Sequence, residues 1–441
     1  MEDEPILIIG AGICGLVLAQ YLRKEKICFR IFERDNDLAT RGVGWGLTLN
    51  WSLPALRSLL PEDLVLRLPE TYVDRASVQA GAISTFPFFD LSTGERKFQT
   101  PKAPESQRIW VTRQKLRVLL ATGIDIEWGK SFSKFDQGRG SVTAAFEDGS
   151  TATGRLLIAC DGANSRARRQ LFPNQNEMHR IPICLMGMKL ELSHEKAQLI
   201  RNLDPFFLQG TSSENNSFIY ISLLDAPQSK GDLTENTSTR YASHGPTTMG
   251  SWTVNTPSNA ERIQLFQRIS STWGEPFLTI AKEVAADQEL KSLELRDFPP
   301  PRGLRTNGRA VLMGDSFHAM AMYRGEGANH AIVDVLDFVE SVGPKFRNED
   351  VGCDSLIESL NAYERSVVER ARTGVLASRQ ACLDAHNWSR ITSESPLLTR
   401  REMKLQFDES NLSDVLYQGG KQCLVPPMSP YGVFSRTDIG G

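Results

Sequence analysis

The chain opens with apolar residues in two different patterns. Residues 6–9 (ILII) are apolar without interruption, which is typical of a parallel strand covered on both faces. Leu16, Ala19 and Leu22 then recur at helical spacing, and residues 28–32 form a second strand-like run. The pattern predicts a strand, a helix and a second strand at the N-terminus.

A similar pattern returns toward the other end of the chain. Residues 310–313 are expected to form another buried strand, and apolar residues at helical spacing follow over 331–339. Residues 355–390 are typical of a long helix. The two ends of the sequence therefore predict parts of one α/β unit.

The middle of the chain has a different character. Residues 177–297 contain strand-like runs such as ICLMGMKLEL and FIYISLLD, separated by polar loops rich in Asn, Ser, Thr and Gly. Residues 82–98 resemble them in composition. We expect these segments to form a mostly antiparallel sheet inserted between the α/β pieces.

Composition narrows the class of protein. The 441 residues are 40% hydrophobic and 23% charged, which is ordinary for a globular chain of two or three domains. The net charge of -3 gives no electrostatic reason to expect a nucleic-acid partner or an anionic membrane surface. We expect no transmembrane segment, since no apolar run reaches the length of a membrane span.

Cysteine and histidine usage argues against disulfides and metals. The seven cysteines are scattered and include no CxxC pair, so they fit neither a disulfide framework nor a zinc site. Reduced thiols and a cytoplasmic location are the simpler interpretation. We expect no metal site, because four histidines stand isolated, without ligand spacing: His179, His194, His244 and His386.

Three glycines follow the first strand at GxGxxG spacing. Gly10 lets the chain turn sharply, Gly12 lets a pyrophosphate approach the backbone, and Gly15 lets the helix pack close to the strand. Glu33, at the end of the second strand, can hold a ribose hydroxyl. Because strand, turn, helix, strand and acid occur in order, we predict a dinucleotide site. This unit alone leaves NAD and FAD open.

Two later motifs identify the dinucleotide. The sequence LIACDGANSRARR occupies residues 157–169, and GRAVLMGDSFHAMAMYRGEGANH occupies 308–330. With the N-terminal glycines, they resemble the GxGxxG, DGxxSxxR and GD…GxGxN motifs of the FAD-dependent aromatic hydroxylases, the single-component group A flavin monooxygenases. The resemblance covers most of residues 1–375. The runs RGVGWGLTLN (41–50) and YRGEGANHAI (323–332) look like a fungal secondary-metabolism branch of that family.

The resemblance implies a set of cofactor-binding residues. Those expected at the ADP half of FAD are Gly10, Gly12, Gly15, Glu33 and the adjacent Arg34. Those expected beside the flavin, the pyrophosphate or the ribityl chain are Arg41, Gly44, Arg113 and Asp315. Those matching the motif linked to pyrophosphate and transient nicotinamide binding are Asp161, Ser165 and Arg168. Those expected to border the isoalloxazine ring are Gly325, Gly327, Ala328 and Asn329.

Several residues of these motifs have competing interpretations. The family usually has a proline shortly before GxGxN, and Met322 stands there in this chain, which puts the shape of the oxygen pocket in doubt. Arg113 also fits a solvated helix surface. His318 is expected to be structural, and Cys160 is expected to be a small core residue at a strand end.

The implied fold is a Rossmann-like FAD-binding domain with an inserted, mostly antiparallel substrate domain and a C-terminal helical segment. The FAD-binding domain is assigned to residues 1–81, 99–176 and 298–375, the substrate domain to 82–98 and 177–297, and the C-terminal helix end and tail to 376–441. Candidates for the pocket wall are Trp45, Phe88, Tyr220, Met249 and Trp252, each of which also fits plain core.

The implied activity is that of an FAD-dependent monooxygenase. FAD is expected to be bound noncovalently, and NADPH or NADH to visit transiently, because only one dinucleotide fingerprint is present. In such a cycle O2 adds to C4a of the reduced flavin, and the hydroperoxide transfers one oxygen atom to an electron-rich aromatic, indolic or polyketide-type small molecule. No catalytic base can be named; Tyr220, Arg240 and His244 are candidates by location alone.

Three alternatives use the same fold. A flavin-dependent halogenase would carry WxWxIP, which the sequence lacks. An FAD-dependent dehydrogenase or oxidase differs only in whether NADPH consumption is tied to oxygen incorporation. A non-catalytic carrier, as for prenylated GTPases, would keep the glycines but would not need the GD…GEGAN segment. The sequence does not indicate the oligomeric state.

Overall fold

The computed structural model of this chain describes residues 4–40, 44–138, 140–226, 239–245, 258–346 and 353–409. A five-stranded parallel sheet has the strand order β17-β11-β1-β2-β7. Its strands are β1 (Ile6–Ile9), β2 (Phe29–Phe32), β7 (Ile126–Glu127), β11 (Leu156–Ala159) and β17 (Ala310–Leu312).

A seven-stranded sheet forms the second layer, in the order β16-β12-β15-β14-β13-β4-β5. All its neighbours are antiparallel except β13 and β4, which pair in parallel. Its strands are β4 (Phe88–Asp90), β5 (Arg96–Phe98), β12 (His179–Leu192), β13 (Phe207–Thr211), β14 (Phe218–Asp225), β15 (Thr239–Gly245) and β16 (Lys291–Asp297). The expected inserted antiparallel sheet is therefore present, and residues 82–98 contribute two strands to it.

Two small antiparallel sheets complete the strands. One has the order β10-β9-β8, with β8 (Phe132–Gln137), β9 (Val142–Phe146) and β10 (Thr151–Gly154). The other pairs β3 (Gly46–Leu49) with β6 (Ile109–Thr112).

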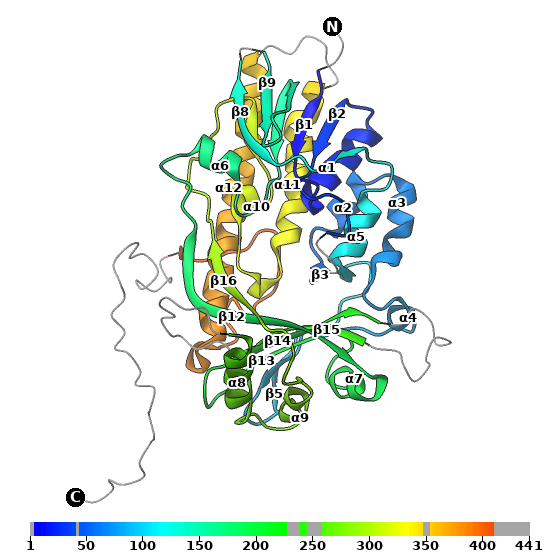
Figure 1. The fold of residues 1–441 in the computed structure, drawn as a ribbon, viewed down its shortest axis with the longest axis vertical. Helices are drawn as coiled ribbons and strands as arrows, with labels where there is room; N and C mark the ends of the chain where they lie inside the picture. The colour runs from blue at the N-terminus through cyan, green and yellow to red at the C-terminus, as the bar shows by residue number, and fades with distance from the viewer. Residues whose placement is uncertain are drawn as a thin grey trace, which may run out of the picture. The chain divides into compact units, whose positions relative to one another are not determined.

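Helices cover the sheets (Figure 1). The α-helices are α1 (Ile13–Lys24), α2 (Leu53–Leu59), α3 (Glu62–Arg67), α4 (Arg75–Gln79), α5 (Arg113–Leu120), α6 (Arg166–Leu171), α7 (His194–Arg201), α8 (Asn259–Ser270), α9 (Phe277–Lys282), α10 (Asp315–His318), α11 (Gly327–Val342) and α12 (Cys353–Ala385). The short 3-10 helices are η1 (Leu68–Thr71), η3 (Met322–Arg324), η4 (Gly343–Phe346) and η5 (Trp388–Arg390). In Figure 1, α8 and α9 cover the face of the seven-stranded sheet that points away from the parallel sheet.

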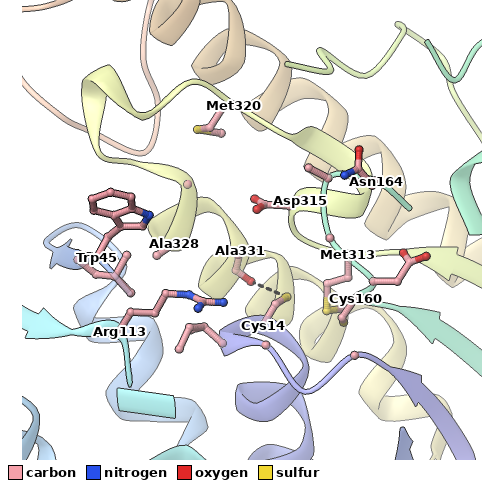
Figure 2. A pocket seen from close by; sticks show the side chains of 18 of the residues that line it. Cys14, Trp45, Arg113, Cys160, Asn164, Met313, Asp315, Met320, Ala328 and Ala331 are labelled. Carbon is pink, nitrogen blue, oxygen red and sulfur yellow. Dashed lines mark hydrogen bonds between the residues drawn. The ribbon is translucent and has the colours of Figure 1, made fainter. Parts of the chain in front are cut away.

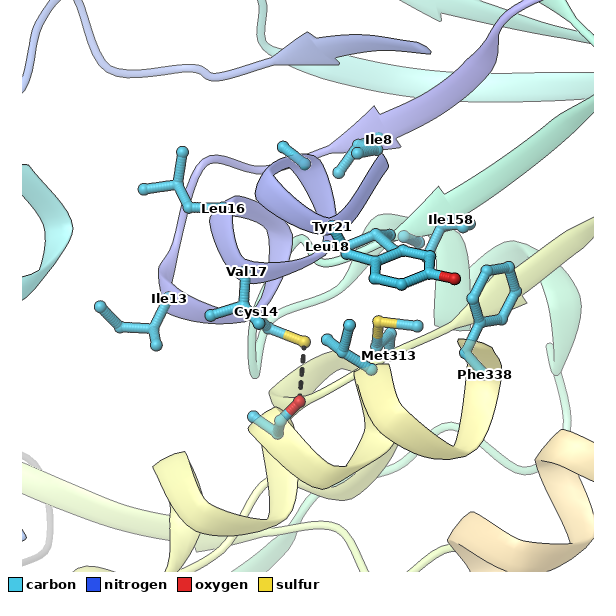
Figure 3. Packing of buried hydrophobic residues seen from close by; sticks show 14 of the residues in the cluster. Ile8, Ile13, Cys14, Leu16, Val17, Leu18, Tyr21, Ile158, Met313 and Phe338 are labelled. Atoms are coloured by element: carbon cyan, nitrogen blue, oxygen red, sulfur yellow. Dashed lines mark hydrogen bonds between the residues drawn. The ribbon is translucent and has the colours of Figure 1, made fainter. Parts of the chain in front are cut away.

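Helix α1 is buried on all sides. Ten of its twelve residues, Ile13 to Leu22, are buried, because the helix lies against the parallel sheet and contacts α2, α5 and α11. Figure 3 shows side chains of this core, among them Leu16, Leu18 and Tyr21. Burying each large apolar side chain contributes about 1.5–3 kcal/mol, which stabilises this packing. The one buried amide, Gln20, donates to the carbonyl oxygens of Leu120 (2.7 Å) and Thr122 (2.9 Å). Its polar group is therefore compensated.

Helix α12 joins the two large sheets. Its first half packs in the core of the parallel sheet through Tyr363 and Val367, and its last turns pack against β12 and β14 through Ala381 and Ala385. The predicted domain boundary at residue 375 falls inside this continuous helix. None of the helices in the described part of the chain is both long and apolar enough to cross a membrane.

A buried ion pair fixes α12 to the end of β16. Arg379 donates from Nε to Oδ2 of Asp297 (2.8 Å) and from Nη2 to Oδ1, and the two side chains are 5% and 0% exposed. Burial raises the pKa of Asp297, and the Arg379 guanidinium opposes that rise. Removing the arginine would leave a carboxylate in the core without its partner.

We predict that Arg379→Met lowers the free energy of unfolding by about 3–5 kcal/mol, the typical cost of breaking a buried pair. The matched control is Arg296→Met, because Arg296 pairs with Glu294 at the surface (2.6 Å) with both side chains about half exposed. Such exposed pairs contribute about 0–1 kcal/mol. Urea unfolding followed by circular dichroism measures both variants, and equal losses would contradict the prediction.

Candidate functional site

A cavity of about 590 Å³ lies at the carboxyl ends of the parallel strands (Figure 2). Gly10 directly follows β1, Glu33 follows β2, Cys160 and Asp161 follow β11, and Met313 follows β17. In open α/β sheets ligands bind at this edge. The cavity also reaches β14 of the seven-stranded sheet, so one continuous space touches both large sheets.

The three glycines of the first turn do different things. Gly10 has φ 106°, and a Cβ there would lie 2.4 Å from the carbonyl oxygen of Cys160. A Cβ on Gly15 would lie 2.1 Å from the carbonyl oxygen of Gly10, so Gly15 packs helix against strand and does not line the cavity. Gly12 lines the cavity, and a Cβ there would meet nothing within 4 Å. The cavity therefore has open space over Gly12.

No side chain caps the N-terminus of α1 at Gly12. The free amides and the dipole of this 12-residue helix favour a negative group at that end. Because Gly12 lines the cavity, that end of the helix meets it. The turn fits the pyrophosphate of a dinucleotide.

Glu33 lines the cavity and orders the turn. Its carboxylate accepts hydrogen bonds from the backbone amides of Ala11 (2.9 Å) and Asp35 (3.1 Å). Arg117 lies 3.5 Å from the same carboxylate and donates from Nε to the carbonyl oxygen of Ala11 (2.8 Å). Arg117 was not predicted as a site residue, although its position four residues after Arg113 on α5 places the two on one helix face.

The cavity lining beside Glu33 includes Arg34, as predicted, and Lys130, which was not predicted. The Lys130 amide donates to the carbonyl oxygen of Glu33 (2.8 Å), and its ammonium group pairs with Asp148 (2.6 Å). Nothing in the sequence near Lys130 marks it as a site residue.

Backbone amides of α6 donate hydrogen bonds to the side chains of the DG motif. Asp161 lines the cavity; its Oδ2 accepts from the amides of Arg166 (2.7 Å) and Ala167 (3.3 Å), while its buried Oδ1 has no partner among the described residues. Ser165 caps α6 by accepting from the amide of Arg168 (2.8 Å). The free Oδ1 leaves Asp161 able to accept one more hydrogen bond.

Arg168 is buried and does not line the cavity, nor does Ser165. The Arg168 guanidinium donates to the carbonyl oxygens of Ser316 (2.9 Å) and Ala163 (2.5 Å), and it stacks on the Phe298 ring at 4.4 Å. Burial lowers the pKa of Arg168 to about 10. Arg168 links the DG motif to α10, and Ser165 caps the helix that carries Arg168. Direct contact of either residue with a cofactor stays a prediction.

Asp315 points into the cavity from the first turn of α10 (Figure 2). Its carboxylate lies deep in the protein but is open to the cavity, and burial raises its pKa. Gly314, with φ 68°, makes the turn that precedes it. Asp315 is thus placed where the sequence predicted it, at the carboxyl end of the strand β17.

A buried network holds that turn. Asp334 of α11 accepts from the Gly314 amide (2.8 Å), from Nε2 of His318 (2.6 Å) and from Nη2 of Arg370 (2.7 Å). Burial opposes ionisation of Asp334, but His318 and Arg370 hold its pKa below the ordinary value. His318 thus has the structural role expected of it, while nothing in the sequence marked Asp334 or Arg370 as part of the site.

The start of α11 forms another part of the wall. Gly325, Gly327 and Ala328 line the cavity. Asn329 is buried beneath them: its amide donates to the carbonyl oxygen of Thr48 (2.9 Å), and its Oδ1 accepts from Ser52 (2.8 Å). Asn329 therefore joins α11 to the end of β3 and does not line the cavity itself.

Arg113 and Gly44 meet at one side of the cavity. Arg113 lines the cavity, and its backbone amide donates to the carbonyl oxygen of Trp45 (3.1 Å). Gly44 has φ 68°, and a Cβ there would lie 3.7 Å from Cδ of Arg113. Gly44 itself does not line the cavity. Arg41 lies outside the described residues.

The end of the cavity away from the glycines of the first turn is largely apolar. It is lined by Trp45, Leu47, Tyr220, Ser222, Met320 and Met322. Gly187 leaves room for the indole, since a Cβ there would lie 3.0 Å from Cη2 of Trp45. Burial raises the pKa of Tyr220 to about 12, so its hydroxyl stays protonated at neutral pH.

The other predicted residues of the pocket wall are buried in the core or lie outside the described residues. Phe88 is fully buried in the core and does not line the cavity. Met249 and Trp252, and the side chains of Arg240 and His244, lie outside the described residues. Cys160, which was expected to be a core residue, is only partly buried and lines the cavity because it follows the last residue of β11. Within the described ranges, no group of His, Cys, Asp and Glu could hold a metal ion.

Comparisons with known proteins agree with this geometry. A family model for an FAD-binding domain matches residues 110–370, and one for an NAD(P)-binding Rossmann-like domain matches residues 8–58. The chain is 41% identical to a probable FAD-dependent monooxygenase of Arthroderma benhamiae, over 93% of this chain and 98% of that protein. It is 33% identical to an FAD-dependent monooxygenase of Emericella nidulans, over 75% and 84%.

Solved structures show the same fold. The 2,6-dihydroxypyridine-3-hydroxylase of Arthrobacter nicotinovorans aligns with a TM-score of 0.69 at 16% identity, over 92% of this chain and 99% of that one. HpxO of Klebsiella pneumoniae, in complex with FAD and uric acid, aligns with a TM-score of 0.65 at 19% identity, over 87% and 89%.

The chain therefore belongs to the FAD-dependent monooxygenases. It is a flavoprotein oxidoreductase whose cofactor is FAD, and the resemblance to a fungal branch of this family is confirmed. The Rossmann-like fold is confirmed as well. The cavity fits FAD because it combines an uncapped helix N-terminus with an unpartnered, buried carboxylate oxygen on Asp161.

We predict that alanine at Gly15 lowers stability, whereas alanine at Gly12 lowers FAD affinity. Gly15→Ala places a methyl group 2.1 Å from a backbone oxygen, so it should lower the free energy of unfolding by several kcal/mol, typically about 1–3 from overpacking and more where backbone must move. Gly12→Ala meets no atom, so the FAD-free protein should keep its stability while FAD affinity falls at least tenfold.

Urea unfolding of the FAD-free protein and fluorescence titration with FAD separate the two effects. Equal loss of stability in both variants would contradict the assignment of Gly15 to packing and Gly12 to the cofactor.

We predict that Asp334→Asn lowers the free energy of unfolding by about 3–5 kcal/mol at pH 7, because His318 and Arg370 lose a buried partner. A carboxylate with a lowered folded-state pKa stabilises above its unfolded pKa, about 3.9, and the gain is lost as pH falls toward the folded value. The difference between wild type and variant should therefore narrow below about pH 4.

Urea unfolding between pH 7 and pH 3 tests this dependence. Asp337→Asn is the matched control, since Asp337 also pairs with Arg370 (2.9 Å) but is 16% exposed; its effect should be smaller. A difference that stays constant with pH would mean that the charge of Asp334 does not matter.

Proposed function

We propose that this enzyme uses NADPH or NADH and O2 to insert one oxygen atom into an electron-rich aromatic, indolic or polyketide-type small molecule. The observation that carries the proposal is the continuity of the cavity. The predicted dinucleotide-binding residues at the carboxyl ends of β1 and β2 and the aromatic residues Trp45 and Tyr220 line one space. A cofactor and a small apolar substrate can therefore meet there without domain motion.

The cavity suggests an order for the parts of FAD. The ADP half would lie along Gly10, Gly12, Glu33 and Arg34, with the pyrophosphate at the N-terminus of α1. Asp315 would hold the ribityl chain. The isoalloxazine ring would lie against Gly325, Gly327 and Ala328. FAD, once reduced, supplies the redox chemistry that activates O2.

Helix α11 would act on the ring through its dipole. It has 16 residues, no side chain caps its N-terminus at Glu326, and Gly327 and Ala328 in its first turn line the cavity. Its amides and dipole favour negative charge beside them. We propose that this helix end stabilises negative charge on the pyrimidine edge of the ring.

The nicotinamide coenzyme would bind transiently. The parallel sheet has one glycine fingerprint, at Gly10–Gly15, and that turn is assigned to FAD. The nicotinamide therefore has no such turn of its own. We propose that it enters from outside, reduces the flavin and leaves, as a single-component enzyme requires.

The apolar end of the cavity would take the substrate. Trp45 offers a flat face, and Met320 and Met322 offer adaptable apolar contacts. Tyr220, protonated at neutral pH, can donate a hydrogen bond to a hydroxyl or carbonyl oxygen, and Ser222 lies beside it on β14. These walls suit a ring system that carries few polar groups. They also exclude water from the reacting atoms.

The domain assignment is also a proposal. The flavin would be bound mainly by residues 1–81, 99–176 and 298–375, and the substrate by the sheet built from 82–98 and 177–297. The seven-stranded sheet supports this division because Tyr220 and Ser222 reach the cavity from its central strand β14.

The function can be tested by following oxygen atoms. We expect the purified protein to show flavin absorbance bands that NADPH bleaches without oxygen and that air restores. With a panel of phenols and indoles under ¹⁸O2, the compound that most accelerates bleaching should gain one ¹⁸O atom. NADPH oxidation without ¹⁸O in any product would instead indicate an oxidase or dehydrogenase.

A further inference from the structure

Two thiols from different elements meet on the floor of the cavity. Cys14 lies in the first turn of α1, and Cys160 directly follows β11; both line the cavity (Figure 2). The pKa of the Cys14 thiol is raised, mainly by the neighbouring Cys160 thiol and secondly by burial. Both are free cysteines. The mechanism proposed above uses neither of them.

Contacts on several sides restrict the Cys14 sulfur and the Cys160 backbone. Sγ of Cys14 donates to the carbonyl oxygen of Ala331 on α11 (3.3 Å), as Figure 2 shows. On another side, a Cβ at Gly314 would lie 3.3 Å from the same sulfur. The Cys160 amide donates to the carbonyl oxygen of Ile9 (2.8 Å), which fixes Cys160 beside β1. Cys14 therefore has little room to move except toward Cys160 or the cavity.

We propose that Cys14 and Cys160 are a redox-sensitive pair that forms a disulfide when hydrogen peroxide enters the FAD-free cavity, and that bound FAD shields them. Cys160 is the more exposed of the two, whereas Cys14 is 9% exposed. Peroxide therefore reaches Cys160 first.

The electrons and atoms balance in two steps. The Cys160 sulfur attacks peroxide, the O–O bond breaks, and a sulfenic acid and one water form. The Cys14 sulfur then attacks the oxidised sulfur, the S–O bond breaks, and a disulfide and a second water form. Two thiols lose two electrons and two protons, and one peroxide is reduced to two waters.

The disulfide would act on cofactor loading. Cys14 lies between Gly12 and Gly15, in the turn to which the proposed function assigns the pyrophosphate, and this part of the inference rests on that assignment. A bond to Cys160 draws the first turn of α1 toward the end of β11 and fixes it. We expect the oxidised protein to bind FAD at least tenfold more weakly, and a thiol reductant to restore binding.

Peptide mapping of the full-length protein tests the pair directly. The protein is treated with hydrogen peroxide with FAD bound and after FAD removal, alkylated without reductant and digested with trypsin. Cys14 then lies in the peptide of residues 1–23 and Cys160 in the peptide of residues 156–166. We expect these two peptides to be linked in the FAD-free protein, at least tenfold more slowly with FAD, and to separate on reduction.

Variants make the result specific. Cys14→Ser should abolish the linked peptide. This variant should fold, because a serine hydroxyl can also donate to the Ala331 carbonyl oxygen. If Cys14→Ser does not fold, Cys160→Ser serves as the second variant. Cys28→Ser is the matched control, since Cys28 is exposed and lies in another tryptic peptide, residues 27–30.

Each outcome decides a different part of the proposal. A folded, FAD-free protein that yields no linked peptide would overturn the pair. A linked peptide that forms equally fast with FAD bound would overturn the shielding, and so the proposed position of the pyrophosphate, while leaving the pair intact.

Discussion

The close approach of α1 to the strand before it is the constraint on which the site depends. A methyl group on Gly15 would lie 2.1 Å from the carbonyl oxygen of Gly10, and one on Gly10 would lie 2.4 Å from that of Cys160. Three backbone segments are therefore in contact without side chains between them. Because they touch, the N-terminus of α1 opens directly above the sheet edge and leaves space over Gly12.

Buried charges then fix the second wall of the cavity. Asp334 holds the turn between β17 and α10 from the adjacent helix by accepting a hydrogen bond from the Gly314 amide. A lone carboxylate at this depth would be unfavourable, but Arg370 supplies opposite charge, and His318 and Arg370 both form hydrogen bonds with it. Breaking the contact of Asp334 with His318 or Arg370 would lower the free energy of unfolding. These contacts therefore hold the turn that places Asp315 at the cavity.

The parts of this site that the sequence predicted are those with local causes. Gly10, Gly12, Glu33, Asp161 and Asp315 all stand at ends of strands, and strand ends can be located from runs of apolar residues. Parallel strands bring these ends to one edge, where their residues can line one cavity. The roles of Asp161 and Asp315 toward FAD were implied by the resemblance to the flavin monooxygenases. The same reasoning located the inserted antiparallel sheet.

The parts of the site that the sequence did not predict depend on residues that are distant along the chain. Asn329 is expected at the flavin, and the sequence did not predict its hydrogen bonds with Thr48 and Ser52, which are nearly three hundred residues away in sequence. Arg168 is expected near the pyrophosphate, and its hydrogen bond to Ser316 was not predicted either; contact of Asn329 and Arg168 with the cofactor stays a prediction. A motif fixes which residues lie near a site; which of them faces the ligand depends on tertiary contacts that periodicity does not encode.

The 3-10 helix η3, which Gly325 follows, also depends on residues distant in sequence. Met322 and Gly325 line the cavity, and Arg324 between them is buried. Its guanidinium pairs with Glu326 (2.6 Å) and donates to the Thr399 hydroxyl (3.1 Å) and the Arg400 carbonyl oxygen (3.0 Å). Only the planar, five-donor guanidinium can satisfy these acceptors together, which a lysine could not do. The segment around residue 400 is distant in sequence from every cofactor motif. It therefore helps, through Arg324, to shape the cavity wall that the substrate would contact.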